Sequence, residues 1–530
     1  MPGKAFNLVR ERWICVMRSD GNVEELSMIE VFQRAPQLHR LAGELPTQDV
    51  ALLRVLLAVL HAVFGRYDLD GTFAPPSSAD NAMARWKALW DRGEFPMGLI
   101  ECYLKTFEDR FNLFDPVRPF FQVSGIGRAT KYGAAKLNGE LSESSNKIRL
   151  FPQRTGDGKK KISYPEAARW LIYVNGYDDT SAKPKEKGLP SPGAGWLGKL
   201  GLIIVVGDNL FETLMLNLVL AKDGCHLWGK ERPVWEADMV RSAERTEIPL
   251  PDNLSELYTL QSRRLLLQRD SDAVIGYTLL GGDFFHKANA LVEQMTAWQM
   301  DVRKYPPERL PRRHDPACQL WRDYSVFFAQ DPGQPGVVKW LAVLHREGLF
   351  NRSAICLQTA GVKYGDNDFF VNDVFSDSLL VDIRLIAASG ESWNHRIMDE
   401  IGDTELLVEK VGSLAQNLAR AAGEQEGGKR KKMVKELAYY RLDLPFRTWL
   451  AAIDPAVTRP DVACEKWWTL AVRIVRNLGA ELMAHSSVKA FIGRAVQESR
   501  VIRYTAPEAY NWFLFRTSCR EALKWGKHNG

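Results

Sequence analysis

Lysine and arginine side chains are concentrated between Asn146 and Lys199. This stretch holds eleven Lys and Arg against five Asp and Glu, a net charge of +6, whereas the whole chain of 530 residues carries +5. Glycine and proline interrupt the stretch and its apolar residues show little periodicity, which indicates a loop-rich segment. Cations focused on such a segment favour phosphate groups as ligands. A lysine-rich solvated loop without a ligand is the alternative.

These cations fall into two groups, and each flanks a turn or a glycine-rich stretch. Five surround Phe151 and the turn Thr155–Gly158: Arg149, Arg154, Lys159, Lys160 and Lys161. Four more flank the stretch Gly188–Gly198: Lys183, Lys185, Lys187 and Lys199. Because each neutralised phosphate of duplex DNA contributes a salt slope of about −0.9, binding through these groups is expected to be strongly salt-dependent.

Gly193, Gly195 and Gly198 have the G-x-G-x-x-G spacing of dinucleotide-binding proteins. That fingerprint follows a strand and opens a helix, so that its backbone can approach a pyrophosphate. Here a charged, proline-containing loop precedes the glycines, and the residues after them look like a strand. We therefore predict no nucleotide and no other cofactor, and interpret the glycines as a flexible loop whose backbone can approach a different ligand.

No other motif selects a catalytic or metal site. The Walker A, H-E-x-x-H and G-x-S-x-G patterns are absent, and no two of the nine His lie three or four residues apart. Seven Cys occur singly, which is typical of reduced thiols in a cytosolic chain. Asp366–Asp368 with Asp373 could hold a divalent cation, but such clusters more often cap turns. We predict no metal and no catalytic residue, although a Ser/His/Asp triad stays open because its members meet only in the fold.

The N-terminal elements that must position the cationic loops mix strands and helices. Alternation in Phe6–Val16 and Glu25–Glu30 around a Ser-Asp-Gly-Asn turn predicts a hairpin that leads into a short helix. Val50–Phe64 is strongly apolar and predicts a buried helix. Two further helices are expected at Asn81–Arg92 and Met97–Phe111, with four aromatic side chains facing inward: Trp86, Trp90, Tyr103 and Phe107.

The rest of the chain changes from mixed to helical. The loop-rich segment contains one convincing helix, Pro165–Tyr173. Further elements are expected downstream, as strands at Leu202–Val206, Leu265–Gln268 and Val274–Leu280 and a helix at Phe211–Leu220. After about Leu385 strand signals fade, and helical stripes such as Leu407, Val411, Leu414 and Leu418 predict a four-helix bundle.

These patterns predict an α+β fold with two domains. A mixed N-terminal domain with small β-sheets and helices covers 1–388 and carries the cationic loops, and a four-helix bundle covers 389–530, with the boundary near 386–395. The run Gly427–Lys432 is interpreted as a solvated loop that opens a helix, with phosphate contact as the alternative. With no run of eighteen apolar residues and no secretion signal, the protein is expected to be cytoplasmic.

Several weak motifs occur in an order that resembles one protein family. Phe6–Ile14 followed by the hairpin, Phe114–Gln122, the cationic loop, the glycine loop, Val206–Asn217 and the turn His314–Pro316 follow each other over nearly the whole chain. The chain is thereby similar to the large subunit of the type I-E CRISPR surveillance complex Cascade, often called CasA. The resemblance implies an α+β N-terminal domain, a C-terminal four-helix bundle and no catalysis.

The resemblance also implies which residues contact nucleic acid. The loop that meets the RNA handle and a neighbouring subunit corresponds to Arg149–Lys161, and the loop that approaches the minor groove to Gly188–Gly198. A lysine finger falls near Lys287, and a wedge that splits the first base pairs falls at Lys363–Asn367. An Asp is repelled by phosphates, so Asn367 or Tyr364 is preferred as the wedge. The implied nucleic-acid-binding residues are Arg149, Phe151, Arg154, Lys159, Lys160, Lys161, Gly193, Gly195, Lys199, Lys287, Lys363, Tyr364 and Asn367.

The implied function is recognition of the protospacer-adjacent motif in foreign double-stranded DNA, help in opening the strands, and recruitment of the effector helicase-nuclease. The implied partners are the guide CRISPR RNA, the other Cascade subunits, the target DNA and that effector, with no membrane. The Cys-rich zinc element of some relatives is absent from this sequence. Two alternatives stay open: a nucleotide-dependent soluble enzyme using the Gly193–Gly198 loop, and a nucleic-acid-binding protein that works alone.

Overall fold

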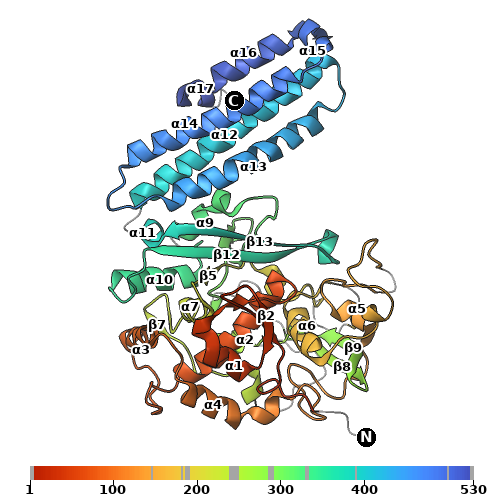
Figure 1. Ribbon diagram of the computed structural model, residues 1–530, viewed down its shortest axis with the longest axis vertical. Coiled ribbons are helices and arrows are strands. Elements are labelled where there is room, and N and C mark those ends of the chain that lie inside the picture. Colours follow the sequence, from red (N-terminus) through yellow and green to blue (C-terminus); the bar gives the residue numbers. More distant parts are fainter. Residues whose placement is uncertain are drawn as a thin grey trace. The chain divides into compact units, whose positions relative to one another are not determined.

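The computed structural model describes residues 5–144, 147–180, 183–184, 191–237, 250–283, 292–328, 333–387, 391–497 and 501–525. The chain divides into two compact units (Figure 1). The first comprises Met1–Cys318 and Ala329–Ser378, and the second comprises Gln319–Phe328 and Leu379–Gly530. The second unit thus begins its long stretch at Leu379 and also includes Gln319–Phe328 from earlier in the chain. The domain ranges 1–388 and 389–530 stay a prediction.

The first unit begins with the expected hairpin. Strands β1 (Ile14–Arg18), β2 (Val23–Leu26) and β3 (Leu38–Leu41) form an antiparallel sheet in the order β2-β1-β3. Helix α1 (Met28–Arg34) follows β2 directly. Ser27 and Glu30 form a capping box at its N-terminus, which satisfies backbone N–H groups that the helix leaves unpaired.

Helix α2 (Pro46–Phe64) lies in the core of this unit and contacts α6, α8 and β12. Its apolar residues cover every face, which is typical of a helix surrounded by protein. Among the described residues it is the one helix with the length and hydropathy of a membrane span, and 94% of that window is buried inside the protein. Helices α3 (Ala79–Arg92) and α4 (Met97–Thr106) follow. Of the four aromatic residues predicted to face inward, Trp86 and Tyr103 are buried, whereas Trp90 and Phe107 are half-buried.

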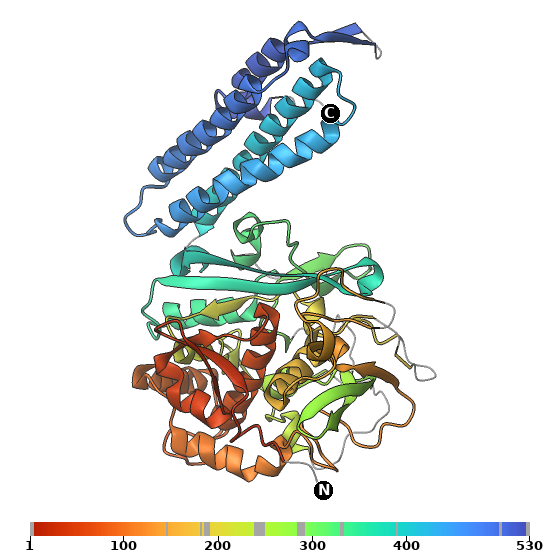
Figure 2. The same cartoon turned by 45° about the vertical axis from the view of Figure 1, so that its right-hand side comes forward.

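A second sheet and helix α6 frame the cationic loop. Strands β4 (Thr130–Gly133), β8 (Arg263–Asp270) and β9 (Ala273–Gly281) pair antiparallel in the order β4-β9-β8. Helix α5 (Ala134–Leu137) follows β4, and α6 (Tyr164–Tyr177) contacts β9. Both views show α6 beside the β8–β9 pair (Figures 1 and 2). The N-cap Ser163 and the proline in the first turn fix where α6 begins.

A third sheet contains a long hairpin that the sequence did not predict. Strands β5 (Ile204–Val206), β12 (Ala354–Tyr364) and β13 (Val371–Asp382) lie in the order β13-β12-β5. The tip of the β12–β13 hairpin contains the predicted wedge. The remaining elements of this unit are α7 (Leu210–Leu216), β6 (Ala221–Lys222), β7 (His226–Leu227), α8 (Leu254–Tyr258), β10 (Trp298–Asp301), β11 (Glu308–Pro311) and α10 (Gly336–Arg346).

The second unit is a helical bundle, as predicted. Its long helices are α12 (Glu391–Ala422), α13 (Gly427–Ala451), α14 (Pro460–Ala484) and α16 (Ala506–Arg516). Figure 1 shows α12, α13 and α14 side by side, and α16 packs on α12 and α14. The predicted stripe Leu407, Val411, Leu414 and Leu418 is fully buried between them. The shorter elements are α9 (Ser325–Phe328), α11 (Ile383–Ile386), α15 (Val488–Ile492), α17 (Arg520–Lys524), and a hairpin of β14 (Arg494–Gln497) and β15 (Val501–Tyr504).

Two details of the bundle differ from the sequence-based expectation. The β14–β15 hairpin adds strands after Leu385, where only helices were expected. The run Gly427–Lys432 forms the first turns of α13 rather than a loop. Lys429 and Lys431 pair there with Glu426 and Glu409, so the positive charge of the run is partly offset by its own unit.

Candidate nucleic-acid interface

The cationic loop, Arg149–Lys161, runs over the surface to the start of α6. Arg149 donates from Nε to the carbonyl oxygen of Leu141 at 2.7 Å. The Arg154 guanidinium lies 2.8 Å from the Glu166 carboxylate, and the Lys159 ammonium lies 2.7 Å from that of Glu143. These three side chains are therefore tied to the unit that carries them, and their charge is partly offset.

Two lysines of the same loop are exposed. The Lys160 ammonium lies 3.2 Å from Asp157, and the Lys161 ammonium lies 4.0 Å from Asp270. Such exposed pairs contribute about 0–1 kcal/mol, so a phosphate can compete for either lysine at low cost. Within this loop, Lys160 and Lys161 are the cations best placed to meet a ligand.

Three large apolar side chains stand out of the same segment. Phe151 is 93% exposed, Leu150 is 90% exposed and Ile148 is 76% exposed. Of these, only Phe151 was predicted as a site residue. An exposed apolar group beside cations is typical of a surface that packs against a protein partner or stacks on nucleic-acid bases.

Lys147 links the cationic loop to the tip of the β12–β13 hairpin, and sequence reasoning missed it. Its ammonium donates to the carbonyl oxygen of Phe369 at 2.6 Å and lies 4.0 Å and 4.6 Å from the ring centres of Phe369 and Phe370. It also lies 3.3 Å from the Asp179 carboxylate. The pKa of Lys147 is lowered because burial disfavours its charged form. The attraction of Asp179 acts in the opposite direction but is the smaller effect.

The hairpin tip carries the predicted wedge residues. Lys363 and Asn367 are exposed, and Asn367 has a left-handed φ of 56°. The carbonyl oxygens of Asn367 and Asp368 each accept a hydrogen bond of 2.9 Å from Thr180, from its hydroxyl and its backbone N–H. Arg313 holds the Asp368 carboxylate through two hydrogen bonds of 2.8 and 2.9 Å. The tip is therefore fixed from two sides.

Tyr364 lies differently from the other wedge candidates. Its hydroxyl donates to the carbonyl oxygen of Tyr177 at 2.8 Å, and a Cβ on Gly198 would lie 1.9 Å from that hydroxyl. The ring packs onto the glycine loop and anchors the tip. Lys363 and Asn367 are left as the exposed wedge candidates, together with the half-exposed rings of Phe369 and Phe370, which the sequence did not single out.

The glycine loop has one surface glycine and two packed ones among its described residues. Gly193 has a φ of +66°, which suits glycine. Gly195 is buried, and a Cβ there would lie 2.4 Å from the carbonyl oxygen of Gly176. The close approach at Gly195 is therefore to the protein's own backbone, so Gly193 is the candidate for approach to a ligand. Lys199 is half-buried beside Gly193.

The structure also bears on the G-x-G-x-x-G motif. Gly198 lies within a single 3₁₀ turn, Leu197–Lys199, and β5 follows. A dinucleotide-binding fingerprint follows a strand and opens a helix, and the glycines here do not have that context. Residues 188–190 of the glycine loop, the flanking Lys185 and Lys187, and the predicted Lys287 lie outside the described residues.

A buried cluster of charges holds these segments at the end of α6. Arg263 donates from Nη2 to the Gly193 carbonyl oxygen at 2.7 Å and from Nε to the Asp178 carboxylate at 2.6 Å. The Lys183 ammonium lies 2.8 Å from Asp178, and that of Lys136 lies 2.8 Å from Asp179.

The pKa values in this cluster reflect burial and pairing. Burial alone would raise the pKa of Asp178, but Lys183 and Arg263 bring it well below its usual range. Burial lowers the pKa of Lys183 to about 8. Buried pairs of this kind hold the segments that carry them together, because separating them would leave a buried charge without a partner.

Among the described residues, no group of three His, Cys, Asp or Glu is placed to hold a metal ion. The contacts instead join the glycine loop and the hairpin tip to the residue that lies two positions before the cationic loop. Lys147 precedes the cationic loop and touches the hairpin tip, Tyr364 of the tip packs on Gly198, and Arg263 fixes Gly193.

The sequence model of the family described as CRISPR-associated protein Cse1 matches residues 7–478. The chain belongs to the Cse1 family. This confirms the resemblance to the large subunit of type I-E Cascade that the ordered motifs indicated. The CRISPR-associated protein CasA/Cse1 of Thermus thermophilus is 28% identical to the chain over 513 residues, which cover 94% of this chain and 95% of that protein.

Solved Cse1 structures share the fold. The crystal structure of Thermobifida fusca Cse1 matches with a TM-score of 0.82 and 30% identity, over 98% of both chains. A chain of a CRISPR RNA-guided surveillance complex matches with a TM-score of 0.60, over 90% of this chain and 99% of that one. Its identity is 16%, so this last likeness is one of fold. The predicted fold class, α+β with a C-terminal helical bundle, is confirmed.

Proposed function

We propose that the chain is the non-catalytic large subunit of a type I-E Cascade. In this role it recognises the protospacer-adjacent motif in double-stranded DNA, aids strand opening and recruits the effector helicase-nuclease. Its partners are guide CRISPR RNA, the other subunits and target DNA. The observation that carries the proposal is the direct contact of Lys147, from the cation-rich stretch between Asn146 and Lys199, with Phe369 and Phe370 at the hairpin tip.

The three segments suit different parts of a nucleic acid. Lys160, Lys161 and the exposed Phe151 provide cations beside an apolar ring, as single-stranded RNA requires. Gly193 presents backbone without a side chain, which a narrow minor groove admits. At the fixed tip, Lys363 can meet a phosphate while Asn367 reaches the first base pairs.

The minor groove distinguishes A·T from G·C pairs but little else. Readout there predicts tolerance of several motif sequences, with the guide RNA supplying the rest of the specificity by base pairing. Lys363 and Asn367, the exposed wedge candidates, are a cationic and an amide side chain and avoid the repulsion from phosphates that the exposed Asp366 of the same tip meets.

The proposal is tested in the complex reconstituted with guide RNA and the other subunits. Asn367→Ala is expected to weaken binding to duplex target and to leave binding to a target with a pre-opened bubble near wild type, because a wedge acts only on closed base pairs. Lys304→Ala, on the β10–β11 loop, is the matched surface control. Equal loss on duplex and bubble targets would contradict the wedge, and unchanged duplex binding would remove Asn367 from the site.

A second arm tests the cationic loop. Lys160→Glu with Lys161→Glu is expected to weaken assembly or the grip on the RNA handle, with Lys304→Glu as control. Assembly and RNA affinity equal to those of wild type would contradict the assignment of this loop.

A further inference from the structure

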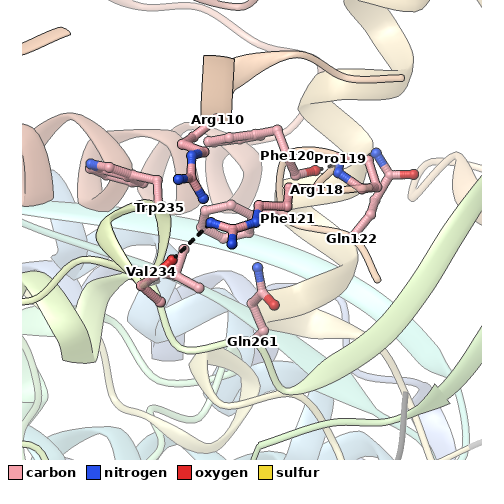
Figure 3. A pocket seen from close by; sticks show the side chains of 10 residues that line it. Arg110, Arg118, Pro119, Phe120, Phe121, Gln122, Val234, Trp235 and Gln261 are labelled. Carbon is pink, nitrogen blue, oxygen red and sulfur yellow. Dashed lines mark hydrogen bonds between the residues drawn. The ribbon is translucent and has the colours of Figure 1, made fainter. Parts of the chain in front are cut away.

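Two pairs of adjacent phenylalanines in the first unit have opposite surroundings. Phe120 and Phe121 are buried, and Figure 3 shows them with Trp235 in the lining of a small cavity. Phe369 and Phe370, at the tip of the β12–β13 hairpin, are instead 47% and 39% exposed. Aromatic rings are usually covered in a folded protein, because they carry the largest apolar surfaces. An exposed pair of rings beside a candidate binding residue indicates a surface that a ligand covers.

Phe369 is held in place without being covered. The Lys147 ammonium lies 4.0 Å from its ring centre and donates to its carbonyl oxygen at 2.6 Å. The rings of Phe369 and Phe370 meet in a T-shaped arrangement, with centres 6.0 Å apart and planes at 71°. Phe370 is fixed in turn, because its carbonyl oxygen accepts a hydrogen bond of 2.8 Å from the Gly365 N–H. A ring that is already ordered loses little conformational entropy when a ligand binds to it.

Phe369 follows the wedge candidate Asn367 by two positions. Two residues span at most about 7 Å, which equals about two base-pair rises of roughly 3.4 Å. The ring therefore lies within reach of the base pair that Asn367 would separate, or of the pair beside it. A base at that point loses its pairing partner and a stacking neighbour when the duplex opens, and that loss costs free energy. An aromatic ring at the same place can replace the lost stacking.

We propose that Phe369 stacks on the first unpaired base of the displaced DNA strand, next to the protospacer-adjacent motif. This inference rests on the proposed function, because that base is free only after the duplex has opened. The matching base of the target strand pairs again with the guide RNA, whereas the displaced base gains no new partner. Lys147 is a positioning residue that holds the ring.

Stacking also suits the variety of targets. The guide RNA changes from one target to another, so the site beside the motif must accept every base. Hydrogen bonds to a base edge would select one base, whereas every base has a π-face on which a ring can stack. A phenylalanine, which carries no hydrogen-bonding group in its side chain, fits this requirement.

The test is permanganate oxidation of target duplex bound by the complex reconstituted with guide RNA and the other subunits. Permanganate attacks the face of an unpaired thymine, so a ring stacked on that face protects it. One thymine is placed at the first displaced position and a second further along the displaced strand as an internal reference. Phe369→Ala is expected to raise the reactivity of the first thymine several-fold relative to the second and to weaken duplex binding about tenfold. Phe369→Trp should keep the protection.

Two further variants serve as controls. Phe73→Ala removes an exposed ring from the loop before α3 and should keep the wild-type pattern. Lys147→Met should raise the reactivity of the first thymine, and Lys147→Arg, which keeps the cation, should restore the protection.

The second thymine distinguishes failure of the stacking from failure of the proposed function. Its reactivity in Phe369→Ala shows that this variant folds and opens the duplex. Unchanged protection of the first thymine in Phe369→Ala would overturn the stacking and leave the proposed function intact. Loss of reactivity at both thymines in that variant would assign the ring to strand opening and would also overturn it. An unreactive second thymine in the wild type would mean that the duplex stays closed, which contradicts the proposed function, and the stacking falls with it.

Discussion

Gly195→Ala should destabilise the first unit strongly, because the new methyl group meets only backbone. A Cβ at Gly195 would lie 2.4 Å from the Gly176 carbonyl oxygen and 2.9 Å from the Tyr177 nitrogen. No flexible side chain can yield, so the loop must move by about 1 Å. That movement disturbs the hydrogen bond of 2.8 Å from the Gly195 N–H to the Asp178 carbonyl oxygen. Overpacking costs about 1–3 kcal/mol and the hydrogen bond about 1, which gives a loss of roughly 2–4 kcal/mol.

Two glycines provide controls for this prediction. Gly193→Ala meets nothing closer than 3.5 Å but keeps a φ of +66°, so a cost of about 1 kcal/mol is expected. Gly98→Ala, in α4 with open space around it, should be neutral or stabilising by up to about 1 kcal/mol. The assay is thermal unfolding followed by circular dichroism, where a unit of this size shifts by roughly 2 °C per kcal/mol. A Tm of Gly195→Ala equal to that of Gly193→Ala would refute the reasoning about backbone packing.

Three further outcomes are expected. Burial raises the pKa of the Glu231 carboxyl to about 7, so the folded state holds the carboxyl proton more tightly than the unfolded state does. The free energy of unfolding should therefore fall by about 3 kcal/mol between pH 4.5 and 7 through this group. Glu231→Gln should remove that fall, as measured by Tm against pH. Lys160→Gln with Lys161→Gln should reduce the salt slope of RNA binding by the assembled complex by roughly 0.7 per lost phosphate contact, and an unchanged slope would separate these lysines from RNA. Arg263→Met should destabilise the protein by about 3–5 kcal/mol, because the buried Asp178 carboxylate and the Gly193 carbonyl oxygen each lose a charged hydrogen-bond donor and only Lys183 stays beside Asp178. The exposed Arg303→Met should change stability by less than about 1 kcal/mol, and equal effects in chemical denaturation would contradict the role of the buried cluster.

The helices and the first hairpin could be predicted because their signals are local. Val50–Phe64 is apolar on every face, and the stripe Leu407–Leu418 repeats at helical spacing. The β12–β13 hairpin was missed because β13 exposes much of its length, so that the polar residues of Val371–Asp382 hide the alternation of a strand.

The candidate site was predictable in its composition but not in its geometry. The charge count located the cationic loop, yet the contact of Lys147 with Phe369 joins residues 222 positions apart, and no local pattern indicates it. The glycine spacing marked Gly193 and Gly195 as equivalent. Only the fold distinguishes them, because the backbone of Gly176 fills the space beside Gly195 alone.

The most direct test of the account is photocrosslinking from the hairpin tip within the assembled complex. A photoreactive amino acid replaces Asn367 in one preparation and Arg303 in another, and each complex is mixed with duplex DNA that carries the motif and a matching target. The account predicts crosslinks from position 367 to the bases beside the motif, and none above background from position 303. Equal crosslinking from both positions, or none from position 367, would contradict the claim that this tip meets the DNA.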